Sequence, residues 1–111
     1  MSISQVIANY ESLSALTGKM RDAAVNGKWE ELVSLEHQSG ELVSVMKIID
    51  AEINLDEPAS AHKAQLINKI LSDETEVRKL TEAWMIELQG ILQSIEQSNR
   101  QEQRLQNTYG V

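Results

Sequence analysis

The stretch that decides the fold runs from residue 70 to residue 95 and reads ILSDETEVRKLTEAWMIELQGILQSI. Its large apolar residues recur at steps of three and four, which is the period of one face of an α-helix. The pattern extends back to Leu66, so the sequence predicts one helix over residues 59–98. At a rise of 1.5 Å per residue, this helix would be about 60 Å long.

Two shorter segments with the same helical period precede this stretch. The first covers residues 3–25 and ends at Asn26-Gly27, a pair that favours the left-handed turn at a helix C-terminus. The second covers residues 28–52 and begins almost at once, so the two helices are expected to form an antiparallel hairpin. Trp29 starts the second helix beside the turn, where its ring is expected to plug the end of the hairpin.

Two details of the long helix are less clear from its pattern. Pro58 marks the loop that separates this helix from the hairpin, and Asp56 and Ser60 are both candidate N-caps there. The apolar stripe is interrupted at Asp73-Glu74, where an apolar residue is expected. We predict a half-turn that faces solvent, or a mild bend, at this interruption, and not a functional acid.

The predicted fold is all-α. We expect residues 1–111 to form a single domain, an antiparallel helical bundle of three main helices in which the third is much longer than the others. The polar residues 99–111 are expected to form a short fourth helix, which persists only when it is docked. Leu105 and Tyr109 lie four residues apart, so both can face one groove and make this segment a regulatory tail.

The hairpin of residues 1–50 is too short to cover the whole third helix, because each of its helices spans only about 35 Å. The far end of the third helix, which includes Leu92, therefore needs a partner or a lid. From the residues alone, Trp84 can be either a core residue or a partner anchor. The predicted partner-binding residues are Val77, Leu80, Trp84, Leu88, Ile91 and Ile95.

The composition argues against several classes of partner. The formal net charge is −7, and neither half of the chain carries a basic cluster. Direct binding to nucleic acid or to an anionic membrane surface is therefore not expected. No apolar run is long enough for a signal peptide or a membrane span, and the absence of cysteine fits a reducing cytoplasm.

Catalytic and metal-binding patterns are also missing from the sequence. His37 and His62 lack the Glu-x-x-His spacing of di-iron bundles and the His-x-x-x-His spacing of zinc sites, and there is no glycine-rich loop for phosphates. We therefore predict no catalytic residue, no metal site and no cofactor, and we do not expect an enzyme. Partners should be proteins.

Three segments of the chain resemble those of a known family. They are NGKWEELVSLE (residues 26–36), ILSDETEVRKL (residues 70–80) and RLQNTYG (residues 104–110). A Gly-x-Trp-x-x-Leu pattern begins at Gly27, and an Asn-x-Tyr-Gly motif begins at Asn107. In order and spacing these segments are similar to the FliT family of flagellar type III export chaperones.

The resemblance implies a small cytoplasmic helical chaperone. Such a protein binds the C-terminal helix of the flagellar filament-cap protein, prevents its premature assembly and delivers it to the type III export ATPase complex. Some members also bind the flagellar master transcriptional activator and act as a repressor of transcription. The resemblance further implies that residues 1–50 contribute to a homodimer, that residues 59–98 bind cargo and that residues 99–111 regulate access.

A second function class remains in play. The chain can instead be a structural helical-bundle or coiled-coil subunit whose third helix pairs permanently with a copy of itself. A sustained heptad would favour this alternative. The interruption at Asp73-Glu74, and Gly90 within the stripe, count against it.

Overall fold

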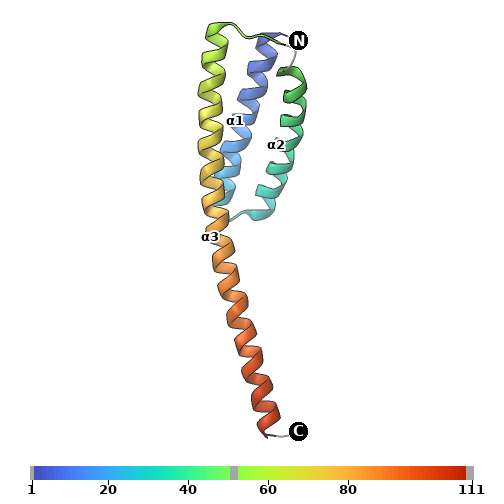
Figure 1. Ribbon diagram of the computed structural model, residues 1–111, viewed down its shortest axis with the longest axis vertical. Helices are drawn as coiled ribbons and strands as arrows, with labels where there is room; N and C mark the ends of the chain where they lie inside the picture. Colours follow the sequence, from blue (N-terminus) through green and yellow to red (C-terminus); the bar gives the residue numbers. More distant parts are fainter. Residues whose placement is uncertain (1, 51–52, 110–111) are drawn as a thin grey trace. The chain divides into compact units, whose positions relative to one another are not determined.

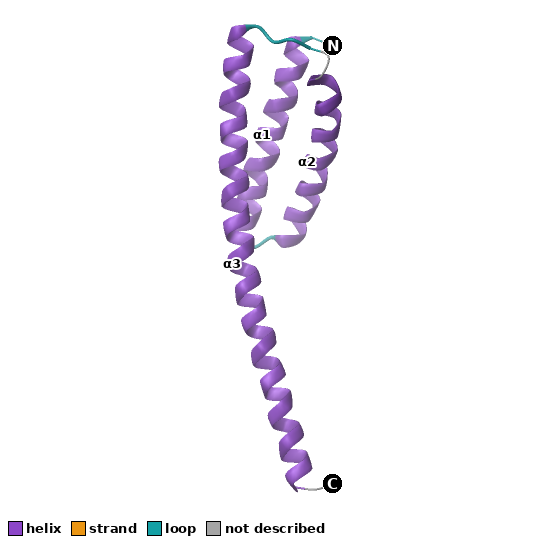
Figure 2. Cartoon of the chain, viewed as in Figure 1, coloured by secondary structure: helices purple, strands orange, loops and turns teal. Residues whose placement is uncertain are grey.

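A computed structural model of the chain describes residues 2–50 and 53–109, and gives the surroundings of side chains as far as Gln101. The described residues form three helices and short loops, which confirms the predicted all-α class in this part of the chain (Figure 2). The helices are α1 (Ile3–Val25), α2 (Trp29–Asp50) and α3 (Glu57–Tyr109).

The contacts within the chain divide it into two units. The N-terminal unit is Met1–Leu80, and the C-terminal unit is Thr81–Val111. In the N-terminal unit, α1, α2 and the first part of α3 lie side by side (Figure 1). The C-terminal unit contains the remainder of α3, up to Tyr109.

The ends of α1 are formed by local hydrogen bonds. Ser2 is the N-cap, and its hydroxyl oxygen accepts a hydrogen bond from the backbone N–H of Gln5 at 3.2 Å. At the other end, Gly27 has a φ of +69°, which a side chain would oppose. The N–H of Lys28 donates to the carbonyl of Ala23 at 2.8 Å, which completes a Schellman turn into α2.

The start of α3 resolves the choice between two candidate caps. Asp56 is the N-cap, because its Oδ1 accepts a hydrogen bond from the backbone N–H of Ala59 at 2.9 Å. Ser60 lies inside the first turn, where its N–H donates to the carbonyl of Asp56. Glu57 stands at the first helical position, where the helix dipole favours an acidic side chain.

The short fourth helix that the sequence predicts is not seen as a separate element. Instead, α3 continues through Ser98-Asn99 to Tyr109. Residues 91–109 contain neither glycine nor proline, and they are rich in Gln, Glu and Arg, which are good helix formers. Two adjacent residues of moderate helix propensity do not end a helix when nothing else in the segment favours a turn.

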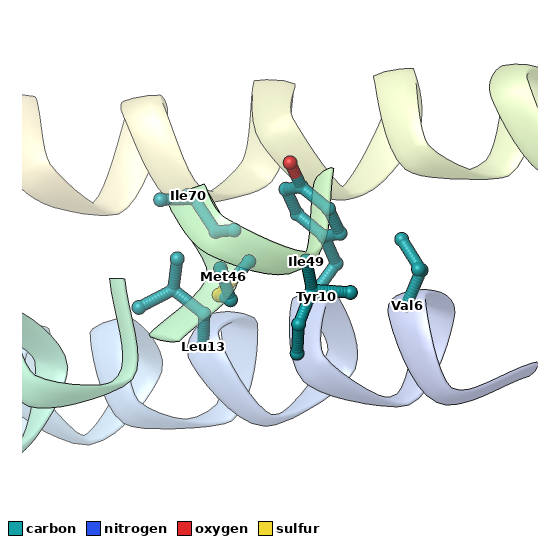
Figure 3. Packing of buried hydrophobic residues seen from close by; sticks show 6 residues of the cluster. All are labelled: Val6, Tyr10, Leu13, Met46, Ile49 and Ile70. Atoms are coloured by element: carbon teal, nitrogen blue, oxygen red, sulfur yellow. The ribbon is translucent and has the colours of Figure 1, made fainter. Parts of the chain in front are cut away.

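Two apolar clusters hold the N-terminal unit together, and all three helices contribute to each. The first cluster contains Val6, Tyr10, Leu13, Met46, Ile49 and Ile70 (Figure 3). The second contains Met20, Ala23, Ala24, Leu32, Leu35 and Val77, with Leu16, Trp29 and Leu80 packed against it. The predicted role of Trp29 at the end of the hairpin is thereby confirmed.

A buried polar layer separates the two clusters, and it overturns the prediction for Asp73. Asp73 is only 6% exposed and does not face solvent. Its Oδ2 lies 3.0 Å from the hydroxyl of Thr17 on α1 and 2.8 Å from Nζ of Lys69, one turn earlier on α3. The same Nζ donates to the carbonyl of Ser14 at 3.0 Å. The interruption in the apolar stripe is therefore a satisfied polar position within the bundle.

A second polar cluster joins the three helices within the first apolar cluster. The hydroxyl of Tyr10 donates a hydrogen bond to the carboxylate of Asp50, and Nζ of Lys63 lies 3.5 Å from the same carboxylate oxygen. This Nζ also lies 5.1 Å from the centre of the Tyr10 ring. Burial, and then the hydrogen bond to Asp50, raise the pKa of Tyr10. Burial lowers the pKa of Lys63, but its contacts with Tyr10 and Asp50 outweigh this effect and raise it.

Candidate protein-binding surface

The C-terminal unit carries a row of apolar side chains, which we call the C-terminal apolar stripe. Its members are Trp84, Leu88, Ile91, Leu92 and Ile95. They follow one another at the steps of three and four residues, with Leu92 beside Ile91, that place side chains on one face of a helix. Ile91, Leu92 and Ile95 are 52%, 55% and 51% exposed. An exposed row of this kind is characteristic of a surface that binds a partner.

The predicted partner-binding residues differ in their surroundings. Val77 is 5% exposed and belongs to the second apolar cluster, so it is unavailable to a partner while the N-terminal unit stays folded. Leu80 is partly buried against the same cluster. Trp84 and Leu88 are also partly buried, whereas Ile91 and Ile95 are half exposed. The exposed part of the predicted set therefore lies in the C-terminal unit.

Besides Leu92, two exposed apolar residues of the C-terminal unit were not among the predicted binding residues. Met85 is 47% exposed and Ile86 is 71% exposed. Ile86 lies two residues from both Trp84 and Leu88, so it faces away from the stripe. Helical periodicity places Ile86 off the main face and therefore gave no reason to select it. Only its large exposed surface in the structure marks Ile86 as a candidate contact residue.

The predicted tail residues Leu105 and Tyr109 lie beyond the side chains that the structure describes. Their backbone belongs to α3, which ends at Tyr109. The regulatory role of this segment therefore stays a prediction.

The N-terminal unit has a separate exposed apolar face on α2. Val33 and Ile48 are 65% and 67% exposed, and they lie on the outer side of this helix. Gly40 lies between them, and a Cβ atom added there would meet nothing within 4 Å. No contact within the described part of the chain therefore explains why positions 33 and 48 are apolar or why position 40 is glycine.

The described residues contain no group of three or more His, Asp or Glu side chains that could hold a metal ion. His37 pairs with Glu41 at 3.1 Å and His62 pairs with Glu11 at 3.2 Å, and both histidines are exposed. Single pairs of this kind are typical of a solvated helix surface.

A shallow pocket of about 470 Å³ lies between the end of α1 and the start of α2. Lys19 and Lys28 line it together with Asp22 and Glu31. Charges of both signs at an open surface do not select one class of ligand. Across the described residues, no helix is both long and apolar enough to cross a membrane.

Comparisons with known proteins agree on one family. Residues 7–111 match the family described as "Flagellar protein FliT". A protein of that name from Pectobacterium carotovorum is 28% identical over 86% of this chain and 76% of its own length. One from Dickeya chrysanthemi is 27% identical over 97% of this chain and 87% of its own length. No solved structure gives a significant match. The chain therefore belongs to the FliT family of flagellar proteins.

Proposed function

We propose that this chain is a flagellar export chaperone whose C-terminal apolar stripe binds an amphipathic helix of the filament-cap protein. The observation that carries the proposal is the exposure of Ile91, Leu92 and Ile95, each of which has about half of its surface in contact with solvent. The family supplies the flagellar context. The chaperone keeps the cap protein from assembling early and delivers it to the type III export ATPase complex.

The stripe fits one mode of recognition. An amphipathic helix that lies along another helix buries side chains at steps of three and four residues, as Leu88, Ile91 and Ile95 present them. Complete burial of one large aliphatic side chain contributes about 1.5–3 kcal/mol, and a half-exposed one contributes about half of that. Several such contacts offset the cost of ordering a peptide and support a reversible complex.

Self-association is a second part of the proposal. We propose that the exposed face of α2, with Val33 and Ile48, contributes to a homodimer. Gly40 and Ser44 lie between these residues and allow two helices to approach closely. Ile48→Glu would then turn a dimer into a monomer in sedimentation velocity, and an unchanged oligomeric state would rule out this face.

Access to the stripe is the third part. Residues 99–109 continue α3, so they can cover the stripe only if the helix breaks and folds back. Ser98-Asn99 is a suitable place for such a break, because both residues have lower helix propensity than their neighbours. The master transcriptional activator would be a second partner of the chaperone, and its binding can be measured with the same variants.

The decisive experiment measures binding of the C-terminal segment of a filament-cap protein to the full chain. Ile91→Ser combined with Ile95→Ser should weaken binding at least about tenfold, because it removes two apolar contacts without leaving a core cavity. Val45→Ser combined with Leu71→Ser is the matched control, since both residues are about half exposed but lie in the N-terminal unit. Equal losses in both variants, or no loss in either, would refute the proposed surface.

The same experiment addresses the structural alternative. A permanent coiled-coil subunit would already have its stripe occupied by a second copy, and its oligomeric state would not change when the cap-protein segment is added. A chaperone should instead form a complex of new size and stoichiometry. Light scattering during size-exclusion chromatography distinguishes the two outcomes.

A further inference from the structure

The charges around the C-terminal apolar stripe indicate the chemistry of its partner. Residues 81–99 contain three acidic side chains, Glu82, Glu87 and Glu96, and neither lysine nor arginine. All three acidic residues are exposed. Residues 81–99 therefore combine the stripe with negative charge alone over about five helical turns.

Two of the three acidic residues lie at the edges of the C-terminal apolar stripe. Glu87 is four residues before Ile91, and Glu96 is four residues after Leu92, so each is a direct neighbour of an exposed stripe residue. Glu82 is three residues before Met85, which is exposed, and four residues before Ile86, which faces away from the stripe. A helix that lies along the stripe must bring its own edge positions close to these carboxylates.

Of the three carboxylates, only that of Glu96 is in an ion pair within the part of the chain whose side chains are described. Glu96 pairs with Arg100, whose Nη2 lies 3.3 Å from its Oε1, and both side chains are largely exposed. Glu82 and Glu87 form no ion pair within the part of the chain whose side chains are described. Their charges are thus available to a partner.

On this basis we propose that the partner of the stripe is an amphipathic helix whose apolar face is bordered by Lys or Arg. The inference rests on the proposed chaperone function and adds the charge pattern that the cargo segment must carry. Complementary charges at the edge of an interface fix the register of the partner and speed its association. The net charge of −7 attracts the same class of partner from a distance.

The same charges disfavour a second copy of this chain as the occupant. Two copies that paired through this stripe would place acidic borders against acidic borders, whichever way the helices ran. Like charges at facing edge positions oppose association and act as a specificity device. The stripe is therefore suited to a basic partner helix and not to self-pairing.

Three synthetic helical peptides test the proposal with the full chain. All share one leucine face, and their border positions carry Lys, Gln or Glu. At an ionic strength of about 50 mM, the Lys peptide should bind at least about tenfold more tightly than the Glu peptide, with the Gln peptide between them. At about 500 mM the preference should shrink to about twofold, because salt screens exposed charges.

Variants that remove acidic charges test whether the preference for the Lys peptide comes from the stripe. Glu82→Gln combined with Glu87→Gln should lower the affinity for the Lys peptide by about two- to fivefold per charge at low salt. The affinity for the Gln peptide should not change. Glu36→Gln with Glu30→Gln is the matched control, because it removes the same net charge from exposed positions on α2. A Lys peptide of scrambled order, without an apolar face, should not bind.

Each outcome separates the charge inference from the proposed function. If all three peptides bind with equal affinity and Ile91→Ser abolishes this binding, the stripe is a docking surface but its partner need not be basic. That result would overturn the charge inference. Equal losses in the Glu82/Glu87 and Glu30/Glu36 variants would also overturn it. Failure of every peptide to bind would count against the docking surface itself. Self-association that Ile91→Ser abolishes would identify a second copy as the occupant.

Discussion

Helix α3 carries one apolar pattern through both units, but the two parts of the pattern have opposite surroundings. In the N-terminal unit, Ile70 and Val77 are 6% and 5% exposed and pack against α1 and α2. In the C-terminal unit, Ile91 and Ile95 are 52% and 51% exposed. The same helical period thus builds a core in one unit and a candidate binding surface in the other. Periodicity shows which face is apolar but not what covers it.

The largest expected difference is in stability. Ile70→Ala should lower the free energy of unfolding by about 2–5 kcal/mol, because it leaves a cavity in the first apolar cluster. Ile91→Ala should change it by less than about 0.5 kcal/mol, because Ile91 is already half exposed. Urea denaturation followed by circular dichroism measures both values. Similar losses of stability in the two variants would show that Ile70 and Ile91 do not differ in their contribution to the core.

Trp84 tests where the core ends and the binding surface begins. Trp84→Ala should weaken binding of the cap-protein segment by about thirtyfold or more, since truncation of an aromatic anchor costs about 2 kcal/mol or more of binding energy. Helix content should remain nearly intact. Calorimetry and circular dichroism on the same sample give both quantities. If the variant unfolds while its folded fraction still binds, Trp84 is a core residue and the binding surface lies elsewhere.

Asp73 is the polar exception within the buried part of the pattern. Asp73→Ala should lower the free energy of unfolding by about 1–3 kcal/mol, because Thr17 and Lys69 lose their shared acceptor. Lys69→Met combined with Asp73→Leu should recover part of the loss, because it removes the buried carboxylate together with its half-exposed cation. Thermal melts of both variants provide the comparison. A double variant less stable than Asp73→Ala would show that the polar layer specifies the packing.

The C-terminal end of α3 should affect binding more than stability. A chain that ends at Ser98 should bind the cap-protein segment several-fold more tightly, because a competing closed state is removed. Its melting temperature should stay close to that of the full chain, since the buried clusters lie in the N-terminal unit. Titration calorimetry of the two chains makes the test. Equal affinities under matched conditions would refute the regulatory tail.

The smallest effect concerns pH and should be confined to the N-terminal unit. The pKa of Tyr10 is raised by burial and by its hydrogen bond to Asp50, so the folded state holds this proton more tightly than the unfolded state. The resulting stabilisation is complete below the unfolded pKa of about 10 and is lost as the pH rises through the folded pKa. Tyr10→Phe should therefore lose stability less steeply above about pH 10 in alkaline denaturation. If the two proteins lose stability equally steeply with rising pH, Tyr10 does not contribute to the pH dependence of stability.

The sequence by itself determined the three helices and most of their ends. Ser2 and Gly27 mark termini through local chemistry, a cap hydroxyl and a positive φ, so no distant contact is needed to find them. The apolar steps of three and four residues located the stripe in the same way. The family resemblance rests on short segments of this kind and is confirmed by the match to residues 7–111.

The predicted helix lengths indicated that the far end of α3 is uncovered, but only the tertiary structure decided where the covered part ends. Asp73 interrupts an apolar row, and the sequence does not show that Thr17 on another helix and Lys69 satisfy it in the interior. Val77 and Ile91 are equivalent in the pattern, yet only Val77 has α1 and α2 packed against it. Burial depends on which helices meet, and this is a property of the packed bundle and not of any single helix.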